Sequence, residues 1–431
     1  MTRKKSIILS SSVILMVVII IGVFYAPLNN KIEQFFWGTP IYSMLNNEEV
    51  MNLHQVITKD SSNSRTIIWQ SFTNSDDYIL EYKLDDNNII KVSPTKDILT
   101  IDDKTIYIYT VILKDLTANT KYQYRIGLKN HRSDWYDLQT EDKEKKDFKV
   151  LIFPDSQSND YTDWQNLAMN AWQKNKDSKF FINMGDLVDN GYALSQWNSW
   201  FNSVESMIST IPIATVQGNH ETYTTDWQVA MPEPYLKLFN LPSNGQESFK
   251  NQYYSFDYGD VHFTVLNTQD DEMADFEPNL LNVQQAWLEQ DLANTKKKWK
   301  IVLMHRDILN YGRDAKPLGD KISFSRHGEI YMPIFDKYNV DAVLTAHLHT
   351  YRRRALLKNF IKDKKGTLYI LTGVAGNVRY PNLWHQNPLD EYIAPQPETN
   401  NYMVLSATEN SLTFSCYLPN NEQIDTIILR K

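Results

Sequence analysis

Five apolar segments of this chain are each followed by a carboxylate, an amide or an imidazole. The segments span residues 149–153, 180–182, 211–216, 299–304 and 341–345. The polar residues that follow them, in the same order, are Asp155; Asp186; Asn219 and His220; His305; and His347 and His349. Short apolar runs of this kind are typical of buried strands. Because strands of an α/β sheet present functional residues at their carboxyl ends, this order predicts one shared site.

The stretch 184–190, MGDLVDN, contains Asp186, the central residue of this pattern. Gly185 allows a sharp turn where the strand at 180–182 ends, and Asp186 then lies at the strand tip. A glycine–aspartate pair alone more often marks an ordinary turn. The other strand ends, each with its own ligand-type side chain, favour a metal site.

The side-chain types in these motifs suit two cations. Imidazole and carboxylate together fit zinc, iron or manganese. A single carboxylate can bridge two ions about 3.5–4 Å apart, which is the geometry used in phosphoester hydrolysis. A lone histidine at a strand end is more often a surface residue, but four of the nine histidines fall within these ordered motifs.

Together the motifs resemble the calcineurin-like metallophosphoesterases, and among them most closely the purple acid phosphatases. The resemblance runs from about residue 45 to the C-terminus and includes the GNHE run at 218–221 and the His-x-His at 347–349. It implies an α/β metallophosphoesterase sandwich with two divalent or trivalent metal ions (zinc, iron or manganese). By this resemblance the first ion is held by Asp155, Asp186 and His349, and the second by Asp186, Asn219, His305 and His347.

The resemblance also implies roles beside the metal ions. His220 is expected to contact the substrate and to protonate the leaving oxygen, with Glu221 orienting His220. Arg352 and His385 are weaker candidates for substrate contact. Arginines in a run such as 352–354 more often pair with carboxylates.

Two positions depart from the family pattern. Purple acid phosphatases place a tyrosine ligand three residues after the bridging aspartate, where this chain has Asp189. Related phosphodiesterases place a histidine two residues after the first aspartate, where this chain has Gln157. Either Asp189 or Gln157 would complete the first metal site through an oxygen atom.

The N-terminal residues 1–28 predict a signal anchor with one transmembrane helix. Arg3, Lys4 and Lys5 precede an uncharged, mostly apolar run at 7–26, and about 18 such residues indicate a spanning helix. The basic residues place the N-terminus in the cytoplasm, so a single-pass protein of the cell membrane with its catalytic body outside is expected. A cleaved signal peptide, which would give a secreted protein, is the alternative.

Two further domains are expected after a tether at 29–47. Residues 48–146 alternate short strand-like runs with polar turns, and the run 116–124 resembles the tyrosine corner of a β-sandwich. We therefore expect a fibronectin type III-like domain there, similar to the N-terminal domain of purple acid phosphatases. The charged run 141–147 predicts a solvated boundary, and residues 147–431 form the expected catalytic domain.

Composition narrows the range of functions. The net charge of −8 argues against a nucleic-acid backbone as a standing partner, and the single cysteine excludes an intrachain disulfide. With the motifs, these features predict an extracytoplasmic phosphoester hydrolase that acts on small phosphomonoesters, with a hydroxide between the two metals as nucleophile. The alternatives are a phosphodiesterase or nucleotide hydrolase, and a cell-surface binding protein whose metals are structural. The sequence does not indicate an oligomeric state.

Overall fold

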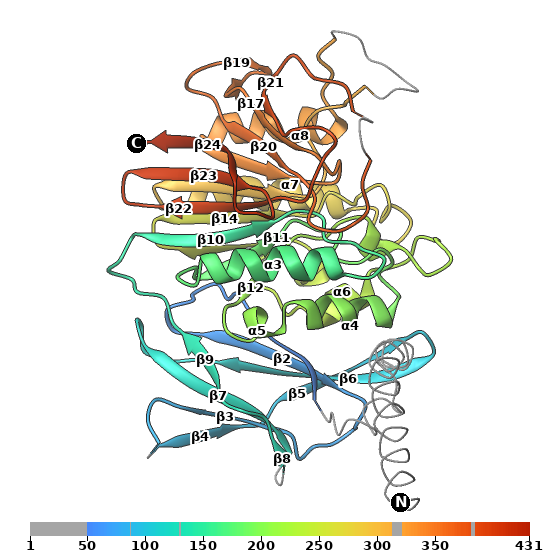
Figure 1. The fold of residues 1–431 in the computed structure, drawn as a ribbon, viewed down its shortest axis with the longest axis vertical. Coiled ribbons are helices and arrows are strands. Elements are labelled where there is room, and N and C mark those ends of the chain that lie inside the picture. Colours follow the sequence, from blue (N-terminus) through green and yellow to red (C-terminus); the bar gives the residue numbers. More distant parts are fainter. Residues whose placement is uncertain (1–49, 87, 129–130, 313–320, 381–383) are drawn as a thin grey trace, which may run out of the picture. The chain divides into compact units, whose positions relative to one another are not determined.

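The computed structural model describes residues 50–86, 88–128, 131–312, 321–380 and 384–431 (Figure 1). The predicted anchor at 1–28 and tether at 29–47 lie outside these residues. Within the described ranges, no helix is long and apolar enough to cross a membrane. Residues Val50–Lys431 make up one compact unit, which contains an N-terminal β domain and an α/β domain.

The N-terminal β domain has two facing sheets. One holds β1 (Met51–Val56), β2 (Arg65–Ser71), β6 (Lys104–Leu113) and β5 (Thr95–Ile101). The other holds β4 (Ile89–Val92), β3 (Ile79–Lys83), β7 (Lys121–Leu128) and β8 (His131–Arg132), with β9 (Tyr136–Gln139) paired to β7.

Side chains of the β domain alternate between two cores, as the period of a strand requires. Ile67 and Trp69 of β2 pack between the two sheets, whereas Ile68 joins the core of the α/β domain. The Tyr122 hydroxyl accepts a hydrogen bond from the Thr117 backbone N–H at 3.0 Å. This contact closes a tyrosine corner within the predicted run.

Two more sheets form the α/β domain. The first contains β24 (Gln423–Arg430), β23 (Ser411–Tyr417), β22 (Tyr402–Ala407), β10 (Phe148–Phe153), β11 (Phe180–Asn183) and β12 (Ile213–Thr215). The second contains β13 (Tyr254–Tyr258), β14 (Val261–Leu266), β15 (Trp299–Met304), β16 (Ala342–Thr345), β20 (Leu368–Thr372), β17 (Tyr351–Arg354) and β21 (Asp390–Ile393). A small hairpin pairs β18 (Leu357–Lys358) with β19 (Ile361–Lys362).

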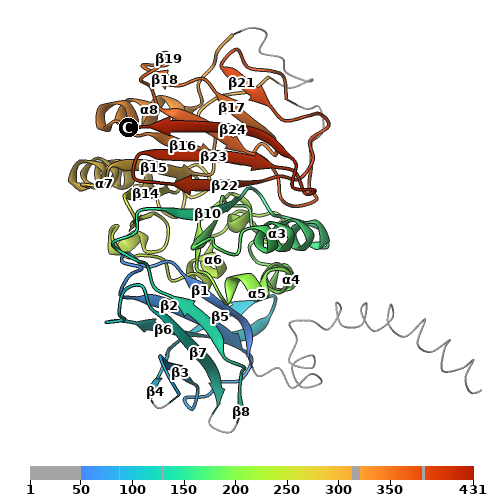
Figure 2. The same cartoon turned by 60° about the vertical axis from the view of Figure 1, so that its left-hand side comes forward.

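Helices cover the outer faces of both sheets (Figures 1 and 2). The first sheet is flanked by α3 (Thr162–Lys174), α4 (Leu194–Ser203), α5 (Glu205–Ile208) and α6 (Glu233–Leu238), and the second by α7 (Leu280–Asn294) and α8 (Arg326–Tyr338). Two short 3₁₀ helices are η1 (His220–Thr222) and η2 (Glu247–Phe249). In β15, Ile301 and Leu303 enter the core between the sheets, whereas Val302 and Met304 pack in the core that includes α7 and α8. Burial on both faces explains why the central strands read as continuous apolar runs.

The two domains share one sheet, which the sequence did not predict. β1 pairs in parallel with β12 through Val56 and Ile213, so the ten-stranded sheet runs across the domain boundary (Figure 2). Glu141, the first residue of the predicted solvated linker, is buried and accepts a hydrogen bond from the Gly259 backbone N–H at 2.7 Å. Burial raises the pKa of Glu141. The start of this segment is therefore fixed against the α/β domain.

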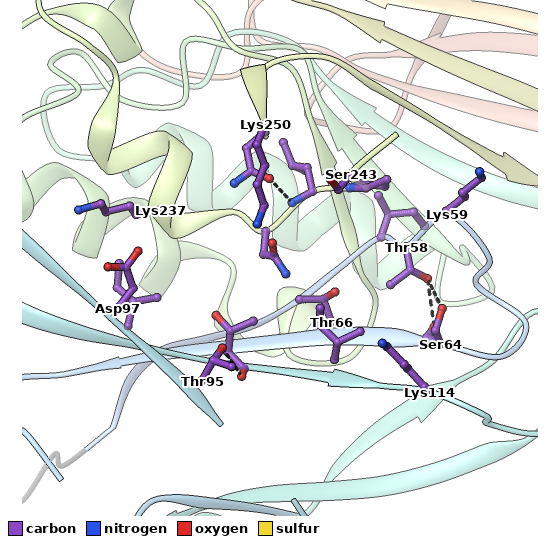
Figure 3. A pocket seen from close by; sticks show the side chains of 18 of the residues that line it. Thr58, Lys59, Ser64, Thr66, Thr95, Asp97, Lys114, Lys237, Ser243 and Lys250 are labelled. Carbon is purple, nitrogen blue, oxygen red and sulfur yellow. Dashed lines mark hydrogen bonds between the residues drawn. The ribbon is translucent and has the colours of Figure 1, made fainter. Parts of the chain in front are cut away.

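A pocket of about 840 Å³ opens where the β domain meets the loop that follows α6 (Figure 3). Lys114 extends into it from the β domain and Lys250 from the opposite wall (Figure 3). None of the predicted site residues is among the described residues that line this pocket. The predicted chemistry belongs to a different part of the molecule.

Candidate metal centre

The loops that follow five parallel strands meet at one edge of the two sheets. They follow β10, β11, β12, β15 and β16, which are the strands expected from the apolar runs. Two groups of possible ligands result, namely Asp186 with His305 and His347, and Asp155 with Asp186 and His349. Within each group the ligand atoms lie within 4.8 Å of one another, and Asp186 is common to both.

Asp155 and His349 face each other in the first group. His349 Nε2 lies 3.1 Å from Asp155 Oδ2, and its Nδ1–H donates to the Val378 carbonyl at 2.6 Å. The His347 backbone N–H donates to both carboxylate oxygens of Asp155, at 3.0 and 3.1 Å. With its Nδ1 proton engaged, His349 points an Nε2 lone pair at the carboxylate.

Asp186 and His305 repeat this arrangement in the second group. His305 Nε2 lies 3.0 Å from Asp186 Oδ2, and its Nδ1–H donates to the Met184 carbonyl at 2.9 Å. The other Asp186 oxygen accepts the His220 backbone N–H at 2.9 Å. Two electron-rich atoms thus face each other in each group, and a positive charge between them is needed to make the contact favourable.

In the protein alone, a proton supplies part of this charge. Burial lowers the pKa of His305, but the carboxylates of Asp186 and Asp155 outweigh burial and raise the value to about 9. Burial by itself raises the pKa of Asp186. The imidazoles of His305 and His220 lower it by more than burial raises it, so the net shift of the Asp186 pKa is downward. A metal ion would replace the shared proton, because metal ligands must be deprotonated.

Three buried polar atoms close to these groups have no hydrogen-bond partner within the described part of the chain. They are Gln157 Oε1, Asn219 Oδ1 and His347 Nδ1. Buried polar atoms are usually paired, so these three are available to a ligand. Each can offer a lone pair to a cation, and imidazole nitrogens with amide and carboxylate oxygens suit zinc, iron or manganese. The residues present therefore fit two metal ions.

The backbone of the ligand loops is held in strained conformations. Asp186, His347 and His349 adopt left-handed backbone conformations with φ of 51°, 75° and 51°. Such conformations cost roughly 1–3 kcal/mol per non-glycine residue and concentrate at functional sites. Gly218 allows a close approach to the shared ligand, because a Cβ there would lie 2.1 Å from Asp186 Oδ1.

Glu221 supports this loop instead of orienting His220. One of its oxygens accepts the backbone N–H groups of Asp186 at 3.0 Å and Gly218 at 2.7 Å, and the other accepts that of Leu187 at 2.8 Å. The contact with the His220 ring expected from the sequence is not among its hydrogen bonds. Burial, followed by the charge of Asp186, raises the pKa of Glu221 to about 7.

His220 lies beside the two ligand groups with one ring nitrogen fixed. Its Nδ1–H donates to the Asp189 carbonyl at 2.7 Å, and its Nε2 lies 3.3 Å from the Gln157 side-chain nitrogen. The Asp189 carboxylate faces the His220 ring and belongs to neither ligand group. Of the two residues considered for the first site, Gln157 has a buried oxygen without a hydrogen-bond partner.

Arg352 and His385 belong to neither ligand group. Arg352 is 2% exposed, pairs with Asp390 at 3.0 Å and donates to the Trp384 carbonyl at 3.1 Å. His385 is exposed, and its backbone N–H donates to the Gly312 carbonyl at 2.9 Å. Arg352 therefore fastens the segment before β21, as an arginine paired with a carboxylate does, and its contact with a substrate stays a prediction.

Three aromatic residues near the centre were missed by the sequence analysis. The Tyr380 ring lies 4.9 Å from that of His349, and Tyr223 and Trp227 contact the ring of His220. Tyr380 follows the run 373–377, whose backbone hydrogen-bonds to Asp155. None of the sequence motifs described above singled out any of these three residues.

Comparison with known proteins agrees with this geometry. Residues 133–351 match the family model of the calcineurin-like phosphoesterases, and residues 50–140 match that of the purple acid phosphatase N-terminal domain. The first match contains all the residues predicted to bind metal. A solved structure of the purple acid phosphatase PPD1 from yellow lupin (Lupinus luteus) seeds shares the fold with a TM-score of 0.70 and 20% identity, covering 88% of this chain and 74% of that one.

Two curated plant proteins illustrate the sequence similarity. The chain is 30% identical over 318 residues to probable inactive purple acid phosphatase 27 of Arabidopsis thaliana, covering 63% of this chain and 49% of that protein. It is 27% identical over 347 residues to purple acid phosphatase 21 of the same plant, covering 75% and 74%. The chain thus spans about half the length of the first of these relatives. It belongs to the calcineurin-like phosphoesterase family and carries the N-terminal domain of purple acid phosphatases ahead of most of the region that matches this family.

Proposed function

We propose that this chain is a metal-dependent phosphomonoesterase that acts outside the cytoplasm. The observation that carries the proposal is the pair of ligand groups that share Asp186, with imidazole lone pairs turned toward carboxylates. We assign Asp155, Asp186, His349 and Gln157 to one ion, and Asp186, Asn219, His305 and His347 to the other. When bound, two such cations activate a water molecule and neutralise charge on the phosphoryl oxygens.

The protein side chains would supply orientation and a proton. Asn219 contributes an oxygen without a charge, which leaves the centre less negative for an incoming phosphate. The Asp189 carbonyl holds the Nδ1–H of His220, so Nε2 is the ring nitrogen that would give a proton to the leaving oxygen, from the doubly protonated ring. Glu221 keeps the Asp186 loop in place through the backbone.

We expect chelation to abolish phosphatase activity and added zinc, manganese or iron to restore it. The full chain should hydrolyse monoesters faster than the matching diesters, because its motifs resemble those of purple acid phosphatases and Gln157 replaces the histidine typical of diesterase relatives. The measurement is turnover of mono- and diesters together with the metal content per chain. Faster diester cleavage would favour the phosphodiesterase alternative, and absence of turnover with two metals bound would favour a binding protein.

The extracytoplasmic location rests on the N-terminal sequence. Arg3, Lys4 and Lys5 precede the uncharged run at 7–26, which supports an anchor with the rest of the chain outside. Protease added to protoplasts should digest the body of the protein while a cytoplasmic marker survives. Deleting residues 1–28 should move the chain out of the membrane fraction. A body that resists the protease, or a mature N-terminus after Tyr25, would contradict the anchor.

A further inference from the structure

We propose that Tyr223 and Trp227 form a subsite for an aromatic leaving group, which would make flat, ring-bearing phosphomonoesters the preferred substrates. The proposal rests on the proposed function and deepens it. Both residues follow η1, which begins with His220, the residue assigned to the leaving oxygen. We call these two side chains the aromatic wall.

Both rings of the aromatic wall contact the ring of His220, the residue assigned as the acid. The His220 ring centroid lies 5.5 Å from that of Tyr223 and 5.8 Å from that of Trp227, and both pairs meet edge to face at 83° and 85°. Tyr223 and Trp227 are themselves 5.9 Å apart. A ring attached to an ester oxygen at His220 would therefore come within stacking distance of the wall, since aromatic pairs interact at centroid separations of about 4.5–7 Å.

Trp227 is exposed although its backbone is firmly held. The side chain is 54% exposed, and the residue has a left-handed φ of 62°. Its N–H donates to the Thr224 carbonyl at 3.0 Å, and the Thr224 N–H donates to the Gln228 carbonyl at 2.9 Å. A bridge between Tyr223 and Val229 closes the loop. Burial does not account for a large ring fixed in this position, whereas a ligand that stacks on it would.

The aromatic wall favours ligands that contain an aromatic ring. The rings of the wall can make apolar contact with a planar aromatic leaving group and can pair with it in a favourable quadrupole geometry. A short alkyl leaving group cannot make the second of these interactions. Aryl phosphates, in which the ring is joined to the ester oxygen, and nucleoside monophosphates, in which a ribose intervenes, share this feature. The wall lies next to His220, and this short separation favours the aryl class.

The test uses two phosphonates that carry CH₂ in place of the ester oxygen, namely benzylphosphonate and ethylphosphonate. Calorimetric titration of the metal-loaded full chain measures binding without turnover. The wild type should bind benzylphosphonate roughly two- to tenfold more tightly than ethylphosphonate, the range expected for one aromatic contact. Trp227→Ala should remove this preference, and Trp227→Phe, which keeps a ring, should retain most of it.

Trp135→Ala is the matched control, because Trp135 lies in the β domain against Lys83 and Arg125. It should leave the preference unchanged, with metal content equal in all variants. An adenosine phosphonate with CH₂ at the 5′ oxygen separates the two ligand sources, and tighter binding of it than of benzylphosphonate would shift the assignment to nucleotides. Equal binding of the benzyl and ethyl compounds by the wild type would overturn the subsite while leaving the phosphatase proposal standing. Binding of neither would overturn both.

Discussion

Asp186→Asn should abolish both metal binding and phosphatase activity, with activity falling by at least roughly 10³-fold. Removal of one hydrogen-bond donor to a transition state already costs about 10²–10³-fold, and Asp186 is the residue assigned to both ions. The substitution also changes the group that faces His305 Nε2. An amide nitrogen in place of Oδ2 would donate a hydrogen bond to the His305 Nε2 lone pair, which now lies 3.0 Å from a carboxylate oxygen. In the variant, the His305 lone pair would have a hydrogen-bond donor, so the site would no longer need a cation.

Metal content, activity and thermal unfolding should be measured together on this variant. The metal-free variant is expected to unfold near the temperature of the metal-free wild type, because the mutation removes one charge and no packing volume. Asp177→Asn is the matched control, since Asp177 pairs with Lys149 on the surface. A variant that keeps two ions would show that Asp186 does not bridge them. Loss of metal with full activity would mean that the metals are structural.

The strand ends could be predicted from sequence because the signal is local. Each apolar run is long enough for one strand, and parallel strands place their carboxyl ends at the same sheet edge. Asp155 and His349, 194 positions apart by their numbers, therefore meet without any contact having to be predicted. The pairing of β1 with β12 gave no such signal, because one parallel register between Val56 and Ile213 depends on how two domains dock.

Residues whose roles depend on distant partners could not be predicted. Glu221 follows His220, but η1 turns consecutive side chains in different directions, so Glu221 points beneath the Asp186 loop. Arg352 belongs to a strand in which it is buried against Asp390, a partner supplied by β21. Trp227 reaches His220 through a loop closed by backbone hydrogen bonds at Thr224, and no pattern in the sequence indicates that turn. In each case the sequence shows the residue type, and the fold decides what it contacts.

His220→Ala should retain both metal ions and lower kcat by about 10²–10⁴-fold for esters with poor leaving groups. His220 is placed for this role because its Nδ1–H is fixed on the Asp189 carbonyl, which leaves Nε2 as the ring nitrogen that can carry the transferred proton. Nitrophenolate leaves without needing a proton, whereas an alkoxide does. The deficit should therefore shrink for 4-nitrophenyl phosphate and remain large for an alkyl phosphate.

The His220 variant also removes the ring that Tyr223 and Trp227 contact, so binding must be separated from chemistry. Damage to the aromatic wall would raise KM for ring-bearing esters, whereas loss of the acid lowers kcat according to the basicity of the leaving group. His131→Ala, an exposed histidine of the β domain, is the control and should change neither constant. An equal loss of kcat on 4-nitrophenyl and alkyl phosphates would remove His220 from the acid role. A graded loss with unchanged metal content would place the transferred proton on Nε2, because the only other ring nitrogen donates to the Asp189 carbonyl.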